Sequence, residues 1–214
     1  TNMKHMFNGA TSFDGNITNW DVSNVSNMQE MLRNTAFNRD LSSWDVSNSS
    51  NIREMFKYAS SFNQDLSTWD VSNVTSMRET FHGATSFNGN ISNWDVSSVG
   101  DMRWMFINAL NFNQDLSTWD VSNVTLMSGM FNSDNVLTDE NKCAIHTSFQ
   151  TNPNWLDDDA TSGVDWSGSC DDDGDGVINS DEVAGCTDES SCNYDADATD
   201  DDGSCYYPSG CDNV

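Results

Sequence analysis

The first 132 residues repeat a single pattern, and its fixed period constrains the fold more than any other feature of the sequence. The pattern combines Phe, Leu or Ile, the tetrapeptide Trp-Asp-Val-Ser, Met and a further Phe. Its tryptophans are separated by 24, 25, 25 and 25 residues; they are Trp20, Trp44, Trp69, Trp94 and Trp119. A period of this length is typical of a solenoid, in which each unit buries its apolar side chains only against its neighbours.

Each unit divides into two halves with different periodicities. In the first half, Trp69 and Val71 lie two residues apart, which predicts a short strand with one buried face. Successive strands of this kind would form a parallel sheet. In the second half, Met28, Met31 and Leu32 have the i, i+3, i+4 spacing of a short helix. We therefore expect an α/β repeat solenoid built from strand–turn–short helix units of about 25 residues.

Composition divides the chain near Ser133. Residues 1–132 contain 13 acidic residues and seven Lys or Arg, whereas residues 133–214 contain 21 acidic residues, Lys142 alone and all six cysteines. The resulting net charge of −26 argues against binding to nucleic acid and insertion into an anionic membrane. Closely spaced cysteines in a small acidic segment predict disulfides and therefore an extracellular or cell-surface location.

The repeat resembles two related families. The run Leu66-x-x-Trp69-x-Val71 is similar to a leucine-rich repeat with Trp in a Leu position and Asn one position early. The longer run from Phe62, Phe-Asn-Gln-Asp-Leu-Ser-Thr-Trp-Asp-Val-Ser-Asn-Val-Thr, is similar to the repeat of BspA-like bacterial surface proteins. This resemblance covers residues 1–132 and implies a right-handed, leucine-rich-repeat-like coil that serves adhesion and protein interaction.

A column of aspartates would recur once per unit on the outer face of the sheet: Asp21, Asp45, Asp70, Asp95 and Asp120. Asx turns with flanking Ser and Asn side chains are one interpretation, and bound cations or ligand are the other. Catalytic carboxylates need environments that separate their pKa values, and equivalent repeat positions do not provide them. The three histidines also lack a catalytic partner at a recognisable spacing, so we predict that the chain is not an enzyme.

Residues that break the repeat are the candidates for recognition. Trp104 occupies the position of the glutamates Glu30, Glu54 and Glu79, and Tyr58 is a second exception. Glu and basic residues three positions apart would otherwise form solvated pairs on the predicted helices. Trp104 and Tyr58 are therefore interface candidates.

Residues 133–170 are expected to close the array as a C-terminal cap, because the end of a repeat array needs a polar closure. Thr138 is the predicted N-cap of a helix that ends at Phe149. A Cys143–Cys170 disulfide would close the following loop, although six cysteines allow 15 connectivities.

Residues 171–182 fit a twelve-residue calcium loop. The predicted ligands supply carboxylate, carbonyl and amide oxygens at positions 1, 3, 5, 7, 9 and 12; they are Asp171, Asp173, Asp175, Val177, Asn179 and Glu182. Neither flank can form a long helix, so the loop resembles isolated EF-hand-like or type 3 thrombospondin calcium loops. The expected cofactor is a structural Ca²⁺ at residues 171–184, and the alternative is a solvated acidic linker.

Residues 185–214 resemble short Cys-rich modules of secreted Bacteroidota proteins, through Gly185-Cys-Thr-Asp, Cys192-Asn-Tyr and Asp201-Asp-Gly-Ser-Cys. A second calcium site is left open at Asp195, Asp197, Asp201 and Asp202. Gly210-Cys211 matches Gly185-Cys186, and no signal peptide is visible, so we expect a segment of a longer polypeptide.

The sequence therefore predicts an extracellular structural or adhesive segment of a bacterial surface protein or filament, stiffened by calcium and disulfides. Its expected partners are other modules of the same polypeptide, a host or neighbouring-cell protein or glycan, and further copies in a fibre. The alternative is a receptor-like module that binds a protein or glycan through the sheet face of the solenoid.

Overall fold

The computed structural model describes residues 1–131, 136–155, 166–170, 181–201 and 203–207. The chain forms two compact units, Thr1–Asp165 and Trp166–Val214. The first contains the repeats and helix α1 (Asp139–Phe149), and the second contains the 3-10 helix η1 (Ser167–Ser169) and strands β1 (Ala184–Gly185) and β2 (Asp200–Asp201). None of the helices in these described parts has the length and apolar character needed to cross a membrane.

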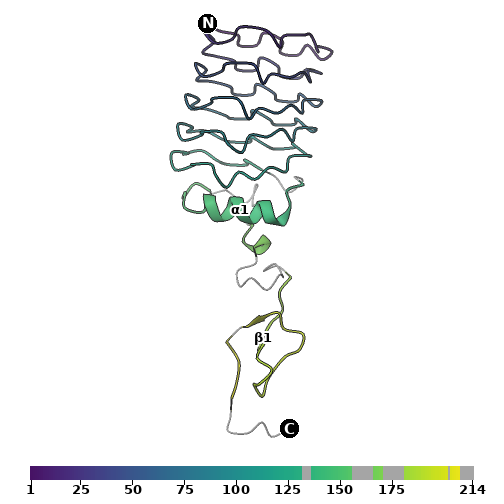
Figure 1. The fold of residues 1–214 in the computed structure, drawn as a ribbon, viewed down its shortest axis with the longest axis vertical. Coiled ribbons are helices and arrows are strands. Elements are labelled where there is room, and N and C mark those ends of the chain that lie inside the picture. Colours follow the sequence, from purple (N-terminus) through teal and green to yellow (C-terminus); the bar gives the residue numbers. More distant parts are fainter. Residues whose placement is uncertain (132–135, 156–165, 171–180, 202, 208–214) are drawn as a thin grey trace. The chain divides into compact units, whose positions relative to one another are not determined.

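The repeats form coils that stack on one another in register (Figure 1). Isolated parallel bridges join equivalent residues of successive coils at Asn2, Asn27, Asn51, Ser76, Asp101 and Leu126. From each bridge, alternate main-chain amides donate hydrogen bonds to the next coil. In one coil, Met77, Glu79 and Gly83 donate to carbonyls of the following coil over 2.9, 3.0 and 2.7 Å. The neighbouring coil therefore supplies the partners that a helix would find within itself.

The predicted short helices are wrong. In the segment that contains Met28, Met31 and Leu32, the backbone makes consecutive turns, because Glu30 and Asn34 adopt positive φ angles of 56° and 54°. A left-handed residue every fourth position interrupts an α-helix. All three apolar side chains are nevertheless fully buried. The i, i+3, i+4 spacing thus reported which residues point inward and not which backbone conformation they adopt.

The predicted parallel sheet is also wrong for the described repeats, which contain no strand. The amide of Trp69 bonds to the carbonyl of Leu66, and that of Val74 bonds to Val71, so two turns replace the strand. Trp69 and Val71 are buried as expected, with 3% and 1% of their surfaces exposed. Parallel pairing occurs in the other half of the unit, at the bridges that precede the buried methionines.

Aromatic ladders fill the core. Neighbouring tryptophan rings lie 6.3–6.5 Å apart from Trp44 to Trp119 and are within 5° of parallel. Each indole N–H also donates to a carbonyl of the preceding coil, as Trp69 does to Leu41 over 3.0 Å and Trp94 does to Leu66 over 3.0 Å. One side chain thus fills the core and gives a buried carbonyl, which already accepts a main-chain amide in its own coil, a second hydrogen bond from the next coil.

Helix α1 takes the place of a further coil at the C-terminal end of the stack. Thr138 is its N-cap, as predicted, and accepts a hydrogen bond from the amide of Asn141. The amide of Thr138 bonds to Asn113 Oδ1, just as Asn113 bonds to Asn88 Oδ1 one coil earlier. The helix buries Phe149 and continues these polar columns. The wider cap of residues 133–170 stays a prediction, since residues 166–170 belong to the second unit.

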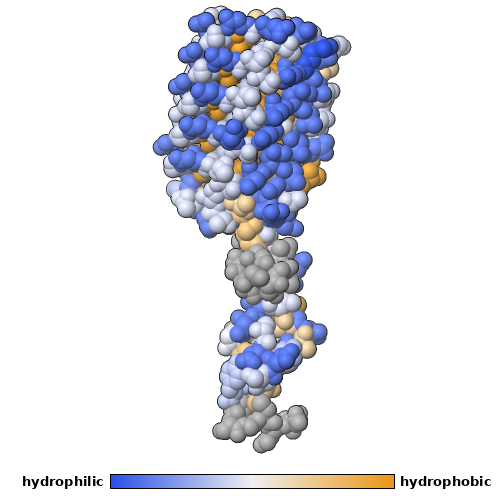
Figure 2. All heavy atoms as spheres, viewed as in Figure 1, coloured by the Kyte–Doolittle hydropathy of each residue, from blue (hydrophilic) through white to orange (hydrophobic). Residues whose placement is uncertain are grey.

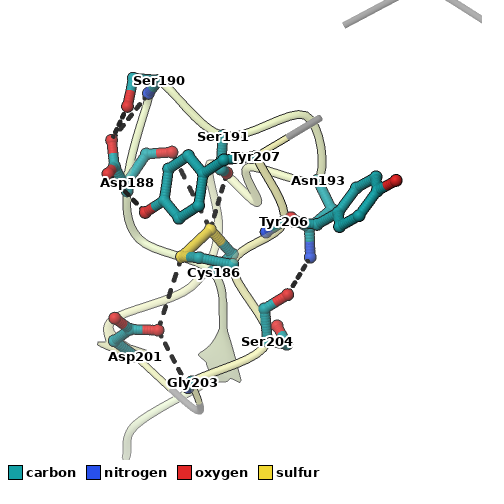
Figure 3. The surroundings of a disulfide bond; sticks show 11 residues. Cys186, Asp188, Ser190, Ser191, Asn193, Asp201, Gly203, Ser204, Tyr206 and Tyr207 are labelled. Atoms are coloured by element: carbon teal, nitrogen blue, oxygen red, sulfur yellow. Dashed lines mark hydrogen bonds between the residues drawn. A yellow bond between two sulfur atoms is a disulfide. The ribbon is translucent and has the colours of Figure 1, made fainter. Parts of the chain in front are cut away.

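A disulfide holds the second unit together (Figure 3). Cys186 and Cys205 are joined with their Cα atoms 4.9 Å apart, and Cys186 is 1% exposed. Strands β1 and β2 pair in parallel beside this bond. Cys143, Cys170 and Cys192 are disulfide-bonded as well. The Cys143–Cys170 connectivity stays a prediction.

Candidate functional site

Like side chains line up in columns along the stacked coils (Figure 2). Six of the seven Lys and Arg residues in 1–131 fall in the turn segments that follow the bridges, and Arg39 is the exception. We call the surface formed by these segments from Glu30 to Trp104 the charged strip, which leaves out Lys4 of the first coil. Its members are Arg33, Arg53, Lys57, Arg78, His82 and Arg103 with Glu30, Glu54, Glu79, Asp101, Tyr58 and Trp104.

Buried glutamates connect the coils within the charged strip. Arg33 lies 2.9 Å from Glu30 in its own coil and 3.2 Å from Glu54 in the next. Lys57 likewise contacts Glu54, at 3.6 Å, and Glu79 of the next coil. The predicted pairs three residues apart are confirmed, although they form on turns and not on helices. The contacts between coils turn isolated pairs into a continuous network.

The electrostatics of this network differ between its carboxylates and its histidine. Burial alone would raise the pKa of Glu79, but the hydrogen bond from Lys57 and the charges of Lys57, Arg78 and His82 hold it below its ordinary value. The pKa of His82 is lowered because burial and the charge of Lys57 disfavour the protonated ring. Its Nδ1 lies 3.3 Å from a Glu79 oxygen without forming a hydrogen bond.

The two aromatic residues that break the repeat are each followed by a glycine at the equivalent position one coil later. A Cβ atom at Gly83 would lie 2.4 Å from the ring of Tyr58, and one at Gly129 would lie 2.5 Å from the ring of Trp104. Each ring therefore rests on the backbone of the next coil. The guanidinium of Arg78 lies 4.6 Å from the centre of the Trp104 ring, a cation–π distance.

The outward charge of the strip is positive. Side chains of Arg53 and Arg33 are 36% and 31% exposed, whereas those of Glu54 and Glu79 are 8% exposed. Tyr58 adds an aromatic ring that is 44% exposed. Sequence reasoning noted Tyr58 and Trp104 but missed the arginines at 53, 78 and 103. The sequence could have identified them, because an arginine recurs one position before Glu54, Glu79 and Trp104.

The aspartate column forms Asx turns, as one of the two interpretations predicted. Asp45 Oδ1 accepts from the amide and the hydroxyl of Ser47 over 3.0 and 2.6 Å, and Asp70 accepts from Ser72 in the same way. These hydrogen bonds lower the pKa of Asp45. The carboxylates are exposed, and they lie on turns and not on a sheet face.

Most of the predicted calcium loop lies outside the described residues: Asp171, Asp173, Asp175, Val177 and Asn179. Glu182 is described and partly exposed. Of the proposed second site, Asp202 is outside the description, while Asp195 and Asp201 each accept a main-chain hydrogen bond within a turn. In the parts of the chain that the structure covers, no group of three or more His, Cys, Asp or Glu residues could hold a metal ion.

One family model matches the chain. It is described as "Mycoplasma protein of unknown function, DUF285", and it matches residues 1–81 and 64–154. No curated protein and no solved structure matches significantly. The two overlapping matches cover all described coils and helix α1.

The charged strip predicts a two-step loss of stability in acid. The pKa of His82 is lower in the folded chain than its ordinary 6.5, so folding disfavours its protonation. Stability should be constant above about pH 7 and should fall as the pH drops below 6.5. A second fall should begin below 4.5, where Glu30 and Glu79, whose folded pKa values are also lowered, lose their charge.

Thermal unfolding measured from about pH 8 to pH 3 tests this expectation. A His82→Gln variant should lose the upper step and keep the lower one. An unchanged upper step in the variant, or a flat profile between pH 7 and pH 5 in the natural chain, would contradict it.

Proposed function

The chain belongs to the DUF285 family, and on that premise we propose that it is an extracellular structural or adhesive segment of a larger bacterial surface protein or filament. Repeats of this family occur in surface proteins and are related to BspA-like repeats. In this proposal the stacked coils are one stretch of a right-handed, leucine-rich-repeat-like solenoid. The second unit continues it as a disulfide-stapled spacer.

The observation that carries the proposal is the continuity of the stack. Successive described coils are joined by main-chain hydrogen bonds and stacked rings, and by the indoles of four tryptophans: Trp44, Trp69, Trp94 and Trp119. Helix α1 extends the same columns. Such an array gains length by adding units, because each unit depends only on its neighbours. A stack of this kind suits a surface segment, because its length is fixed by the number of coils and each coil presents the same side chains.

We propose no catalytic role. The ionisable side chains of the strip are engaged in pairs that connect coils, as Arg33 and Lys57 illustrate. The disulfides support an oxidising location, since such bonds are rare in the cytosol.

The alternative function is that of a receptor-like module for a protein or glycan. The exposed Asx-turn carboxylates favour it, because they would recur at every coil of a binding face.

Surface labelling of intact producing cells tests the location. A membrane-impermeant amine reagent should modify Lys4, which is exposed, before lysis, and should spare Lys57, whose side chain is 11% exposed. Thiol alkylation without reduction should label no cysteine among residues 143–205. Labelling of Lys4 only after lysis, together with reduced cysteines, would contradict the proposal.

Calcium binding at residues 171–182 is the second part of the proposal, and it rests on the donor set: three aspartates, a carbonyl, an amide and Glu182. A bound ion would offset the mutual repulsion of these carboxylates and stiffen the spacer. Extracellular calcium modules bind at about 10⁻⁴–10⁻³ M. At 10 mM calcium the expected stabilisation of this segment is therefore about 1.4–2.7 kcal/mol.

Limited proteolysis and unfolding of the full chain, with 10 mM calcium or with chelator, measure that effect. Cleavage within residues 171–184 should accelerate on chelation, and an Asp171→Asn, Glu182→Gln variant should behave like the chelated protein at both calcium levels. Magnesium is the control ion. Equal cleavage with and without calcium would rule out the structural ion.

A further inference from the structure

We propose that the charged strip binds the aspartate column of a second copy of this chain, so that copies associate side by side. The aspartate column consists of the exposed Asx-turn residues Asp21, Asp45, Asp70, Asp95 and Asp120. This inference deepens the proposed structural role and rests on it, because it names the surface through which such a segment would join its neighbours.

The composition of the strip is that of a protein interface and differs from the rest of the repeats. Tyr, Trp and Arg are enriched at the energetic centres of interfaces. Tyr58, Trp104 and four of the five arginines of residues 1–131 lie in the strip, while the other exposed columns carry Asp, Asn, Ser and Thr. Both rings are held in place by Gly83 and Gly129, so little side-chain freedom remains to be lost on binding.

The charges on the two surfaces are complementary and remain available. The arginine side chains at 53, 78 and 103 are 36%, 24% and 28% exposed although each already contacts a carboxylate. In the aspartate column, the Asx turn uses Oδ1 of Asp45, Asp70 and Asp95. Within the described contacts, the other carboxylate oxygen can accept a hydrogen bond from a guanidinium.

The spacing of the two columns favours a second copy over other anionic partners. Arg53, Arg78 and Arg103 recur once per coil, and so do the aspartates at 45, 70, 95 and 120. Both columns follow the same stack, in which equivalent rings lie about 6.3 Å apart. The spacing of the arginines in one copy therefore equals the spacing of the aspartates in another, so several arginine–aspartate pairs can form at once. An unrelated polyanion would match only if its charges had the same period.

Each copy carries both surfaces, which decides the kind of assembly. The strip and the aspartate column occupy different segments of the coil, so their pairing is heterologous, and one copy can bind two neighbours. The net charge of −26 opposes this association over long distances. Salt near 0.1 M screens that repulsion beyond about 10 Å while leaving close pairs less affected. Association should therefore be present at about 0.1 M salt and lost near 1 M.

Two double variants test the two surfaces one at a time while keeping the local hydrogen bonds. Arg53→Gln with Arg78→Gln weakens the strip; Gln29 occupies that column naturally, and Glu54 and Glu79 keep Lys57 as a partner. Asp70→Asn with Asp95→Asn weakens the aspartate column; Asn90 shows that asparagine accepts the same Asx-turn bonds, from Ser92. Asp65→Asn with Asp115→Asn is the control, with the same charge change in another column.

Sedimentation velocity of the full chain, at concentrations up to about 1 mM, tests the proposal. The natural chain and the control should associate at 0.1 M salt, whereas each of the two double variants alone should associate at least tenfold more weakly. A mixture of the two variants should recover a 1:1 dimer, because each contributes the surface that the other lacks.

Three results would overturn the proposal: a natural chain that stays monomeric, association that both variants retain, or a control that loses association equally. Binding of heparin by a monomeric chain would assign the strip to a polyanion and would also overturn it. None of these results would alter the surface-labelling outcome, so failure here is distinguishable from failure of the proposed function.

Discussion

Hydrogen bonding between coils is the constraint on which the rest of the structure depends. The turns of these segments satisfy only alternate amides locally, such as that of Thr80, so the amides between them, such as those of Glu79 and Gly83, bond to the next coil. This requires equivalent residues to stay in register over every unit. The fixed period of about 25 residues, the stacked rings and the columns of like side chains all follow from that requirement.

The sequence predicted the inward residues well and the backbone poorly. Spacing identified the buried tryptophans, phenylalanines and methionines, the N-cap at Thr138 and the Asx turns. It could not reveal the positive φ angle at Glu30, because glutamate rarely adopts one and the hydrogen bond from its amide to the neighbouring coil forms only in the stack. Without that angle, a segment such as Met28–Leu32 satisfies the pattern of a helix equally well.

The charged strip was predictable only in part, for a related reason. Pairs such as Glu30 and Arg33 follow from local spacing, but the contact from Arg33 to Glu54 depends on how the coils stack. The match between Tyr58 and Gly83 likewise joins residues 25 positions apart. Basic side chains that bridge buried carboxylates serve the stack, and their exposed ends remain available to a partner. Cohesion and recognition can thus share one surface.

The indole bonds between coils test this account most directly, and Trp69→Phe and Trp20→Phe are a matched pair. Trp69 is 3% exposed and donates to the carbonyl of Leu41, whereas Trp20 is 39% exposed and its indole makes no such bond to the described residues. In urea unfolding of the full chain, Trp69→Phe should lower the free energy of unfolding by about 1–3 kcal/mol, because it removes a buried hydrogen bond between coils and part of a closely packed ring, although the Leu41 carbonyl keeps its bond from the Trp44 amide. Trp20→Phe should lower it by less than about 0.5 kcal/mol. Equal losses in the two variants would contradict the claim that bonds between coils hold the structure together.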